Sequence, residues 1–249
     1  MRAKEVATLF MSGEIETNKV SVVIPVYNEE RSLAEVLDLV CAVELDGLIK
    51  EIIISDDGST DETPHIISQY IEHATEIVKV HTSPTNLGKG AAVRLGISQA
   101  SGDVVIIQDA DLELSPQEYT RLLQPILAGE ATVVYGSRFA SRQNQISRRT
   151  RWANWFLTKL TNVLFGAHLT DMETAYKAFR REALTNLKLR CVRFDFEPEV
   201  TAKLLQAGHQ IHEVPISYRP RTVDEGKKIS WIDGFEAVYT LFRCRFLDK

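Results

Sequence analysis

The hydrophobic positions along the chain alternate between short β-branched runs and longer stretches with helical spacing. The short runs predict buried strands at residues 20–26, 51–55, 77–80, 104–108 and 131–135. Apolar side chains spaced as in helices predict helices at residues 32–43, 63–72, 88–100 and 116–128. Such an alternation predicts right-handed βαβ units and hence an α/β fold with a mostly parallel central sheet flanked by helices.

The pattern changes after Arg138. It predicts a long amphipathic helix at 148–165, a strand at 175–179, a helix at 197–206, a strand at 210–217 and a final helix at 231–246. No internal repeat or low-complexity linker interrupts this order. We therefore expect an N-terminal extension at residues 1–19 and a single domain at residues 20–249.

Composition narrows the class of protein. A chain of 249 residues is long enough for a sizeable core, and a net charge of −5 argues against a nucleic-acid partner. The cysteines are widely spaced and form no metal or redox motif, which fits a reducing cytoplasm. Neither a signal peptide nor an apolar run long enough to span a membrane is visible, so we expect a cytoplasmic protein that is at most peripheral.

Polar clusters follow several predicted strands at their carboxyl ends. They lie at residues 27–29, 56–57, 109–111 and 136–138. In open parallel sheets, ligands bind beyond the carboxyl ends of the strands. The sequence therefore predicts a binding site at this edge of the sheet.

Three acidic residues in this region are spaced by two: Asp109, Asp111 and Glu113. If the chain stays extended past the strand, their side chains point to one side and could hold Mg²⁺ or Mn²⁺. The alternative is a set of solvated acids beside a helix cap at Ser115.

Two other segments suggest contacts with a ligand. The carboxylates of Asp56 and Asp57 could accept hydrogen bonds from a nucleobase or ribose, or Asp-Gly-Ser could form an Asx turn that leads into a helix. The glycine-rich helix entry at residues 86–90, with Lys89, favours an anion.

An arginine-rich stretch suits a phosphate-bearing ligand, or it forms a solvated helix face. Its members are Arg138, Arg142, Arg148, Arg149 and Arg151. The following apolar positions predict a packed helix face, with shallow membrane contact as the alternative. They are Trp152, Trp155, Phe156 and Leu160.

Taken in order, the motifs VVIPVYNEE (22–30), DDGSTD (56–61), NLGKG (86–90), DAD (109–111) and GSR (136–138) resemble family-2 glycosyltransferases of the GT-A fold. The motifs DMETAYK (171–177), EVPIS (213–217) and EGKK (225–228) are similar to those of polyprenyl-phosphate sugar synthases, the dolichyl-phosphate mannosyl- and glucosyltransferases among them. The resemblance spans residues 20–242. It implies a donor-binding half at about 20–138 and an acceptor-binding half at about 139–249.

The resemblance implies a metal-dependent, inverting hexosyltransferase. The hexose would pass from a nucleotide-sugar of the GDP-mannose or UDP-glucose type to a polyprenyl or dolichyl phosphate. The implied ligands of Mg²⁺ or Mn²⁺ on the donor diphosphate are Asp109, Asp111 and, as a possible third, Glu113. The implied donor nucleotide pocket consists of Pro25, Tyr27, Glu29, Asp57, Lys89, Asp109 and Ala110.

On the acceptor side, the resemblance implies that arginines hold the phosphate. The candidates are Arg138, Arg148, Arg149 and Arg151. Lys227 would reach the phosphates from a closing loop, and Asp171 would act as a base or an orienting group. Access to the lipid would come from peripheral contact with the cytoplasmic face of a membrane or from a membrane-anchored partner subunit.

Other functions stay open at this point. One is transfer to a saccharide or protein hydroxyl instead of a lipid phosphate. Another is a non-catalytic, Mg²⁺-binding domain of receiver type, which also places acids at strand ends, and a third is a sugar-binding pseudoenzyme.

Overall fold

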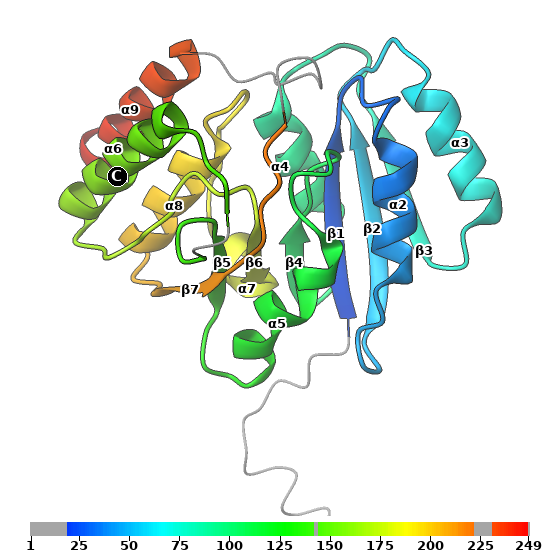
Figure 1. Ribbon diagram of the computed structural model, residues 1–249, viewed down its shortest axis with the longest axis horizontal. Helices are drawn as coiled ribbons and strands as arrows, with labels where there is room; N and C mark the ends of the chain where they lie inside the picture. The colour runs from blue at the N-terminus through cyan, green and yellow to red at the C-terminus, as the bar shows by residue number, and fades with distance from the viewer. Residues whose placement is uncertain (1–18, 142–143, 222–230, 249) are drawn as a thin grey trace, which may run out of the picture.

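The computed structural model describes residues 19–141, 144–221 and 231–248, with the side chains of residues 231 and 232 left out. Its centre is a seven-stranded sheet in the order β3-β2-β1-β4-β6-β5-β7 (Figure 1). The strands are β1 (Lys19–Val26), β2 (Ile49–Asp56), β3 (Ile77–Thr82), β4 (Val104–Ile107), β5 (Val133–Ser137), β6 (Lys177–Arg180) and β7 (Ile211–Pro215).

The sheet is mostly parallel, as the strand–helix alternation predicts. In the centre, Val22 of β1 pairs with Ile52 of β2 on one side and with Ile106 of β4 on the other. The exception is β6, which runs antiparallel to both of its neighbours, β4 and β5. Both β5 and β6 begin two residues later than the sequence pattern predicts.

Helices lie in the places that the helical spacing predicts. They are α2 (Leu33–Ala42), α3 (Thr63–His73), α4 (Lys89–Gln99), a 3₁₀ turn (Pro116–Glu118), α5 (Tyr119–Leu127), α6 (Arg148–Phe165), α7 (Arg181–Thr185), α8 (Phe196–Gln206) and α9 (Trp231–Phe246). The short α7 was not predicted, because one turn of helix carries no periodic pattern to detect.

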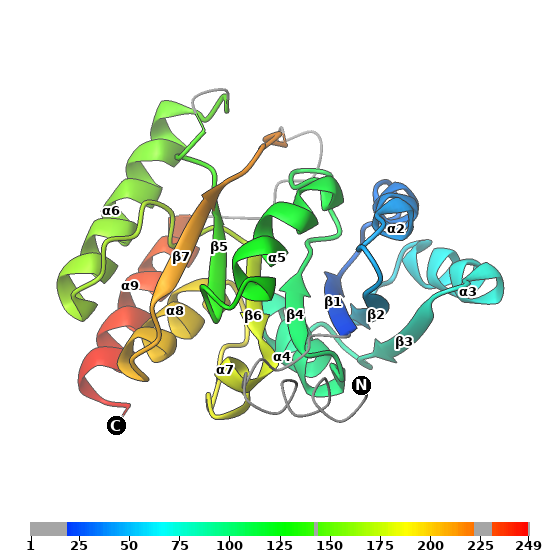
Figure 2. The same ribbon diagram turned by 90° about the horizontal axis from the view of Figure 1, so that it is seen from below.

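Two hydrophobic layers cover the sheet because alternate strand residues point to opposite faces. On one face, side chains such as Val22 and Ile24 pack against α2, α3 and α5. On the other face, Val23 and Ile53 pack against α4, and Phe179 lies in the same cluster with residues of α7 and α8. A third cluster joins α6, α8 and α9 beside the sheet, at the end away from α2 and α3 (Figure 2).

The expectation of a packed face on α6 is wrong for three of its four residues. Trp152, Trp155 and Phe156 are exposed at 68%, 53% and 46%, whereas Leu160 is half-buried and packs against the third cluster. The buried face of α6 is formed instead by Asn154, Leu157, Thr158 and Thr161. Apolar side chains occur on both faces of α6, and only the neighbouring elements decide which face is covered.

Among the described residues, none of the helices is both long and apolar enough to cross a lipid bilayer. The longest of those with a full description, α6, carries four basic residues.

Candidate active site

The carboxyl ends of β1, β2 and β4 meet at one edge of the sheet because these strands are parallel neighbours. The first strand ends at Val26, three residues before Glu29, and β4 ends at Ile107, two residues before Asp109. The fold thus brings together the acidic motifs that lie apart in the sequence, as expected from the strand order.

Asp57 holds the glycine-rich entry of α4. Its two carboxylate oxygens accept hydrogen bonds from the backbone N–H groups of Leu87 at 2.9 Å and Gly88 at 2.6 Å. Burial raises the pKa of this carboxyl group. Gly88 has φ of 110°, a conformation that a side chain would strain, so the loop depends on glycine here.

Asp56 is buried like Asp57 but keeps one carboxylate oxygen without a partner among the described residues. One oxygen accepts the N–H of Ser59 at 3.0 Å, which is the turn that Asp-Gly-Ser predicts. The other, Oδ2, is buried and has no hydrogen-bond partner among the described atoms. A buried acceptor without a donor costs free energy unless a ligand supplies one. The family resemblance implies Asp57 for the nucleotide pocket, but Asp56 is the acid whose carboxylate keeps an unpaired oxygen within the described part of the chain.

Lys89 links the two halves of the domain electrostatically. Its ammonium group lies 2.9 Å from Asp109 and 3.0 Å from Glu197 of α8. Burial alone would lower the pKa of Lys89, but these two carboxylates raise it above its usual value. Lys89 therefore stays charged beside Asp109. The sequence pattern gave no reason to select Glu197, because it lies about ninety residues from the other acids.

The chain does not stay extended after β4, contrary to the expectation. It turns at residues 111–114, and the N–H of Glu113 donates to Oδ1 of Asp111 at 3.1 Å. The Glu113 carboxylate instead accepts from the N–H of Arg221 at 2.8 Å and the hydroxyl of Tyr218 at 3.3 Å. Among the described residues, Asp109, Asp111 and Glu113 are not grouped closely enough to act together as ligands.

Arg221 occupies the space between the acids of two strands. Its guanidinium lies 2.5 Å from Asp111 and 3.2 Å from Glu29. Burial, together with the negative charges of Asp109 and Glu113, raises the pKa of Asp111 to about 7, and Arg221 counteracts this. No sequence motif pointed to Arg221.

The donor set suits a hard divalent cation. Asp109 and Asp111 present carboxylate oxygens at the end of β4, and Asp111 already draws a positive charge to within hydrogen-bond distance. A cation there would neutralise the two carboxylates that Lys89 and Arg221 neutralise in this structure.

The remaining donor-side predictions cluster at the end of β1. Pro25 is buried in the strand, Tyr27 and Glu29 are half-buried, and the Ala110 carbonyl accepts from Ser32 Oγ at 2.8 Å. These residues lie together near the acids.

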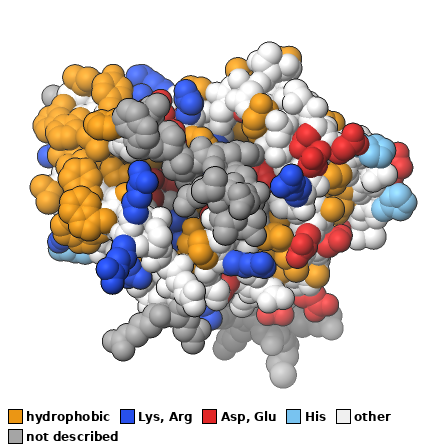
Figure 3. Space-filling model, turned by 45° about the horizontal axis from the view of Figure 1, so that its top comes forward, with side chains coloured by type: hydrophobic (Ala, Val, Ile, Leu, Met, Phe, Trp, Pro, Cys, Tyr) orange, Lys and Arg blue, Asp and Glu red, His pale blue; other side chains and the backbone are white. Residues whose placement is uncertain are grey.

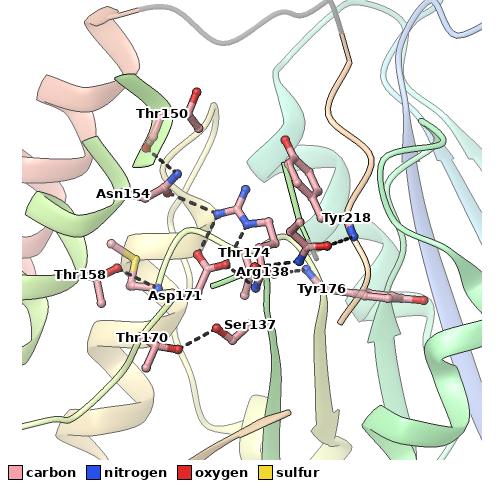
Figure 4. Close-up of polar contacts among 12 residues, drawn as sticks. Ser137, Arg138, Thr150, Asn154, Thr158, Thr170, Asp171, Thr174, Tyr176 and Tyr218 are labelled. Atoms are coloured by element: carbon pink, nitrogen blue, oxygen red, sulfur yellow. Dashed lines mark hydrogen bonds and ion pairs between the residues drawn. The ribbon is translucent and has the colours of Figure 1, made fainter. Parts of the chain in front are cut away.

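Arg138 and Asp171 form a buried pair on the other side of the site (Figure 4). The guanidinium donates two bonds, Nε to Oδ2 at 2.8 Å and Nη2 to Oδ1 at 2.7 Å, and the Arg138 N–H adds a third at 2.9 Å. Asn154 of α6 accepts from Nη2 at 3.3 Å. The backbone N–H of Asp171 in turn donates a hydrogen bond to the Glu213 carboxylate at 2.9 Å.

The first turn of α6 carries three of the predicted arginines. Ser147 caps this helix by accepting the N–H of Thr150 at 3.1 Å, and Arg148 and Arg149 are exposed beside it. The guanidinium of Arg151 lies over the ring of Phe139, 5.7 Å from its centroid. Positive charge at a helix N-terminus is unfavourable without an anion nearby. Lys227 and Arg142 lie outside the described residues.

A buried charged cluster lies behind Asp171. The Lys177 ammonium donates to the carbonyl of Met172 at 2.9 Å and lies 4.0 Å from the centroid of the Tyr135 ring. Glu173 Oε1 is buried and has no hydrogen-bond partner within the described part of the chain. Burial, then the charge of Glu197, raises the pKa of Glu173 to about 8.

Tyr218 joins the two sides. Its ring lies 5.4 Å from the Arg138 guanidinium carbon, and its hydroxyl lies 3.3 Å from the Glu113 carboxylate. The acidic edge and the Arg138–Asp171 pair are therefore separated by no more than one aromatic side chain.

Known proteins are similar to this chain in sequence and in fold. The chain is 32% identical over 230 residues to an undecaprenyl-phosphate 4-deoxy-4-formamido-L-arabinose transferase of Klebsiella pneumoniae subsp. pneumoniae, covering 91% of this chain and 67% of that one. It is 30% identical to the protein of the same name from Photorhabdus laumondii, covering 92% and 68%.

Among solved structures, it is similar to glucosyl-3-phosphoglycerate synthase from Mycobacterium tuberculosis, in complex with Mn²⁺, UDP and phosphoglyceric acid. The TM-score is 0.68 at 25% identity, with 91% of this chain and 78% of that chain covered.

The sheet and its flanking helices have the GT-A architecture, as the sequence motifs predict. The family model for glycosyl transferase family 2 matches residues 21–187, which overturns the receiver-type alternative. The chain belongs to glycosyltransferase family 2.

Proposed function

We propose that this glycosyltransferase moves a sugar from a nucleotide-diphosphate donor to the phosphate of a polyprenyl lipid, with inversion at the anomeric carbon. The observation that carries the proposal is Tyr218, which contacts both the acidic edge at Glu113 and the Arg138–Asp171 pair. A nucleotide-sugar bound at the acidic edge and an acceptor phosphate bound near the Arg138–Asp171 pair would therefore lie close enough to react.

The donor side offers groups for each part of a nucleotide. The free oxygen of Asp56 suits a nucleobase N–H or a ribose hydroxyl. The ammonium group of Lys89 and the guanidinium of Arg221 suit the diphosphate. UDP is bound in the solved structure of the mycobacterial synthase, so a uridine donor is the first to test.

A divalent cation, Mn²⁺ or Mg²⁺, would be held by Asp109 and Asp111 and would neutralise negative charge on the departing diphosphate. Binding there requires Arg221 to release Asp111, since the guanidinium occupies that carboxylate. Once released, the guanidinium is free to contact the diphosphate.

The acceptor side suits a phosphate that is already ionised. The capped N-terminus of α6, with Arg148, Arg149 and Arg151, provides backbone N–H groups and positive charge in one place. A phosphate monoester needs little help from a base at neutral pH. Asp171 is fully buried and bonded to Arg138 through both oxygens, so we assign it to orienting Arg138 rather than to taking a proton.

The decisive experiment is a matrix of donors and acceptors with purified protein. The donors are UDP-glucose, GDP-mannose and a UDP-linked form of 4-deoxy-4-formamido-L-arabinose, the sugar in the relatives' name. The acceptors are a short-chain polyprenyl phosphate and water-soluble saccharides, each with Mn²⁺, with Mg²⁺ and with EDTA. We expect transfer to the lipid phosphate with one of the donors, dependent on the cation.

Transfer to soluble saccharides with none to polyprenyl phosphate would overturn the acceptor assignment in favour of a hydroxyl acceptor. Full activity in EDTA would overturn the metal assignment. Transfer of glucose or mannose would support the hexose expected from the sequence, whereas transfer of the formamido-arabinose alone would refute it.

A further inference from the structure

The side of the molecule formed by α6 and α9 exposes two aromatic stripes. On α9, Phe235, Tyr239, Phe242 and Phe246 follow one another at intervals of four, three and four residues, and all are exposed. This is one continuous face of a helix. The rings of Phe242 and Phe246 stack at 6.0 Å between centroids. The opposite face of α9, with Ala237 and Leu241, is buried.

The stripe on α6 has the same character. Trp152, Trp155, Phe156 and Val163 are all exposed, and the rings of the two tryptophans lie 5.9 Å apart. Because α6 packs against α9, the two stripes belong to one side of the protein. Figure 3 shows hydrophobic side chains gathered there, with lysine and arginine side chains beside them. We call these eight residues the aromatic platform.

An exposed apolar surface of this extent marks an interaction site in a soluble protein. Its charges indicate which kind. The whole of α6 contains no acidic residue, and its exposed charges are Arg148, Arg149, Arg151 and Lys159. Arg245 is exposed on α9. Lysine and arginine next to tryptophan and phenylalanine is the pattern of helices that lie in a membrane interface with anionic headgroups.

A second copy of the chain fits this surface less well. A twofold dimer sets a patch against the same patch of its partner, so the cationic residues of the two α6 helices would approach one another. An anionic bilayer surface instead offers the opposite charge along the whole length of α6.

The platform is also next to the acceptor side of the site. Asn154 on the buried face of α6 accepts a hydrogen bond from Arg138, and the aromatic residues lie on the opposite face of the same helix. The two are separated by roughly one helix diameter, about 10 Å. If α6 lies on a bilayer, the phosphate of a lipid in that bilayer is therefore only about 10 Å from the Arg138 side of the helix.

We propose that the aromatic platform docks this protein on an anionic lipid bilayer, with α6 and α9 lying in the interface. The proposal deepens the proposed function, because it supplies the route to a lipid acceptor, but the docking itself does not require that any sugar be transferred.

The test is co-sedimentation with vesicles that contain no polyprenyl phosphate. Vesicles of phosphatidylcholine mixed with phosphatidylglycerol should bind the protein, and vesicles of phosphatidylcholine alone should bind it at least about tenfold more weakly. The double variant Phe242→Ser/Phe246→Ser should lose about tenfold or more in affinity for the mixed vesicles, because its apolar contact with the interface is gone. The variant Lys159→Gln/Arg245→Gln should lose binding to the mixed vesicles and little to the neutral ones.

The matched control is Ile71→Ser, an exposed aliphatic residue on α3 at the far end of the sheet. It should bind as the unaltered protein does. Unchanged melting temperatures would show that the variants are folded. Transfer to a water-soluble, short-chain acceptor should be the same in Phe242→Ser/Phe246→Ser, so a failure of docking is distinguishable from a failure of the proposed reaction.

Two results would overturn the proposal. One is that the unaltered protein binds neither vesicle. The other is a dimer, seen by light scattering, that Phe242→Ser/Phe246→Ser converts to a monomer without any effect on vesicle binding.

Discussion

The guanidinium of Arg221 lies 2.5 Å from the Asp111 carboxylate, although 110 residues separate them in sequence. The same side chain also contacts Glu29, so one arginine after the last strand neutralises acids that follow two other strands. In this structure, the Arg221 guanidinium pairs with the Asp111 carboxylate that would otherwise be a ligand of the proposed metal ion.

Arg221→Gln should therefore bind Mn²⁺ more tightly than the unaltered protein, because the cation no longer has to displace a guanidinium from Asp111. We expect a decrease in Kd of roughly tenfold, for a difference of about 1.4 kcal/mol. The metal-free variant should also be less stable by about 1–3 kcal/mol, since a charged hydrogen bond is lost. Titration of Mn²⁺ by electron paramagnetic resonance and melting in EDTA measure the two effects.

Arg219→Gln is the matched control for that variant. The Arg219 side chain is exposed, and its backbone N–H already bonds Glu113, so both measurements should stay near those of the unaltered protein. Equal Mn²⁺ affinity in Arg221→Gln and the unaltered protein would show that the arginine and the metal do not compete.

Asp111→Ala should abolish sugar transfer while leaving the fold intact. Loss of a group that supports charge in the transition state costs about 10²–10³ in rate, and we expect at least that loss in kcat. Circular dichroism checks the fold, and transfer of radiolabelled sugar checks the activity. A fully active variant would remove Asp111 from the metal hypothesis.

Asp171→Asn should destabilise the protein as well as inactivate it. The change leaves the Arg138 guanidinium buried without its counterion, and breaking a buried pair in this way costs about 3–5 kcal/mol. The double variant Arg138→Gln/Asp171→Asn should recover much of that stability, because no buried charge is left, but it should stay inactive. Urea unfolding of the single and double variants gives the interaction free energy. Additive losses would argue against direct coupling.

Glu173→Gln should remove a pH dependence of stability between about pH 5 and 8. The pKa of Glu173 in the folded protein, about 8, lies above its ordinary value, so the folded state holds the proton more tightly than the unfolded state. This contribution is complete at acidic pH and is lost as the pH rises toward 8. Between about pH 5 and 8, the free energy of unfolding of the unaltered protein should fall by about 1–3 kcal/mol more than that of Glu173→Gln.

Urea unfolding of both proteins at several pH values measures the difference. Glu182→Gln changes an exposed residue of the short helix α7 and serves as a control that should leave the pH dependence unchanged. Parallel curves for Glu173→Gln and the unaltered protein would mean that Glu173 is already ionised at neutral pH.

Much of the proposed donor side could be predicted from the sequence. Asp57 and Asp109 lie one and two residues after buried strands, and parallel neighbours place the carboxyl ends of these strands at one edge. The proposed acceptor side was predicted only in part. Arg138 and Asp171 were selected from separate motifs, but their bonding to each other depends on the antiparallel β6 being inserted between β4 and β5.

The amino-acid sequence by itself determined the strands, the helices and the acids at the strand ends, because these follow from hydrophobic spacing and from turn residues within a few positions. Only the tertiary structure decided that Glu113 turns toward Tyr218, that Arg221 and Glu197 join the site, and that the aromatic face of α6 is left uncovered. Each of these depends on chain segments far apart in sequence, whose approach is set by packing and by the pairing of buried charges, and no local pattern records it.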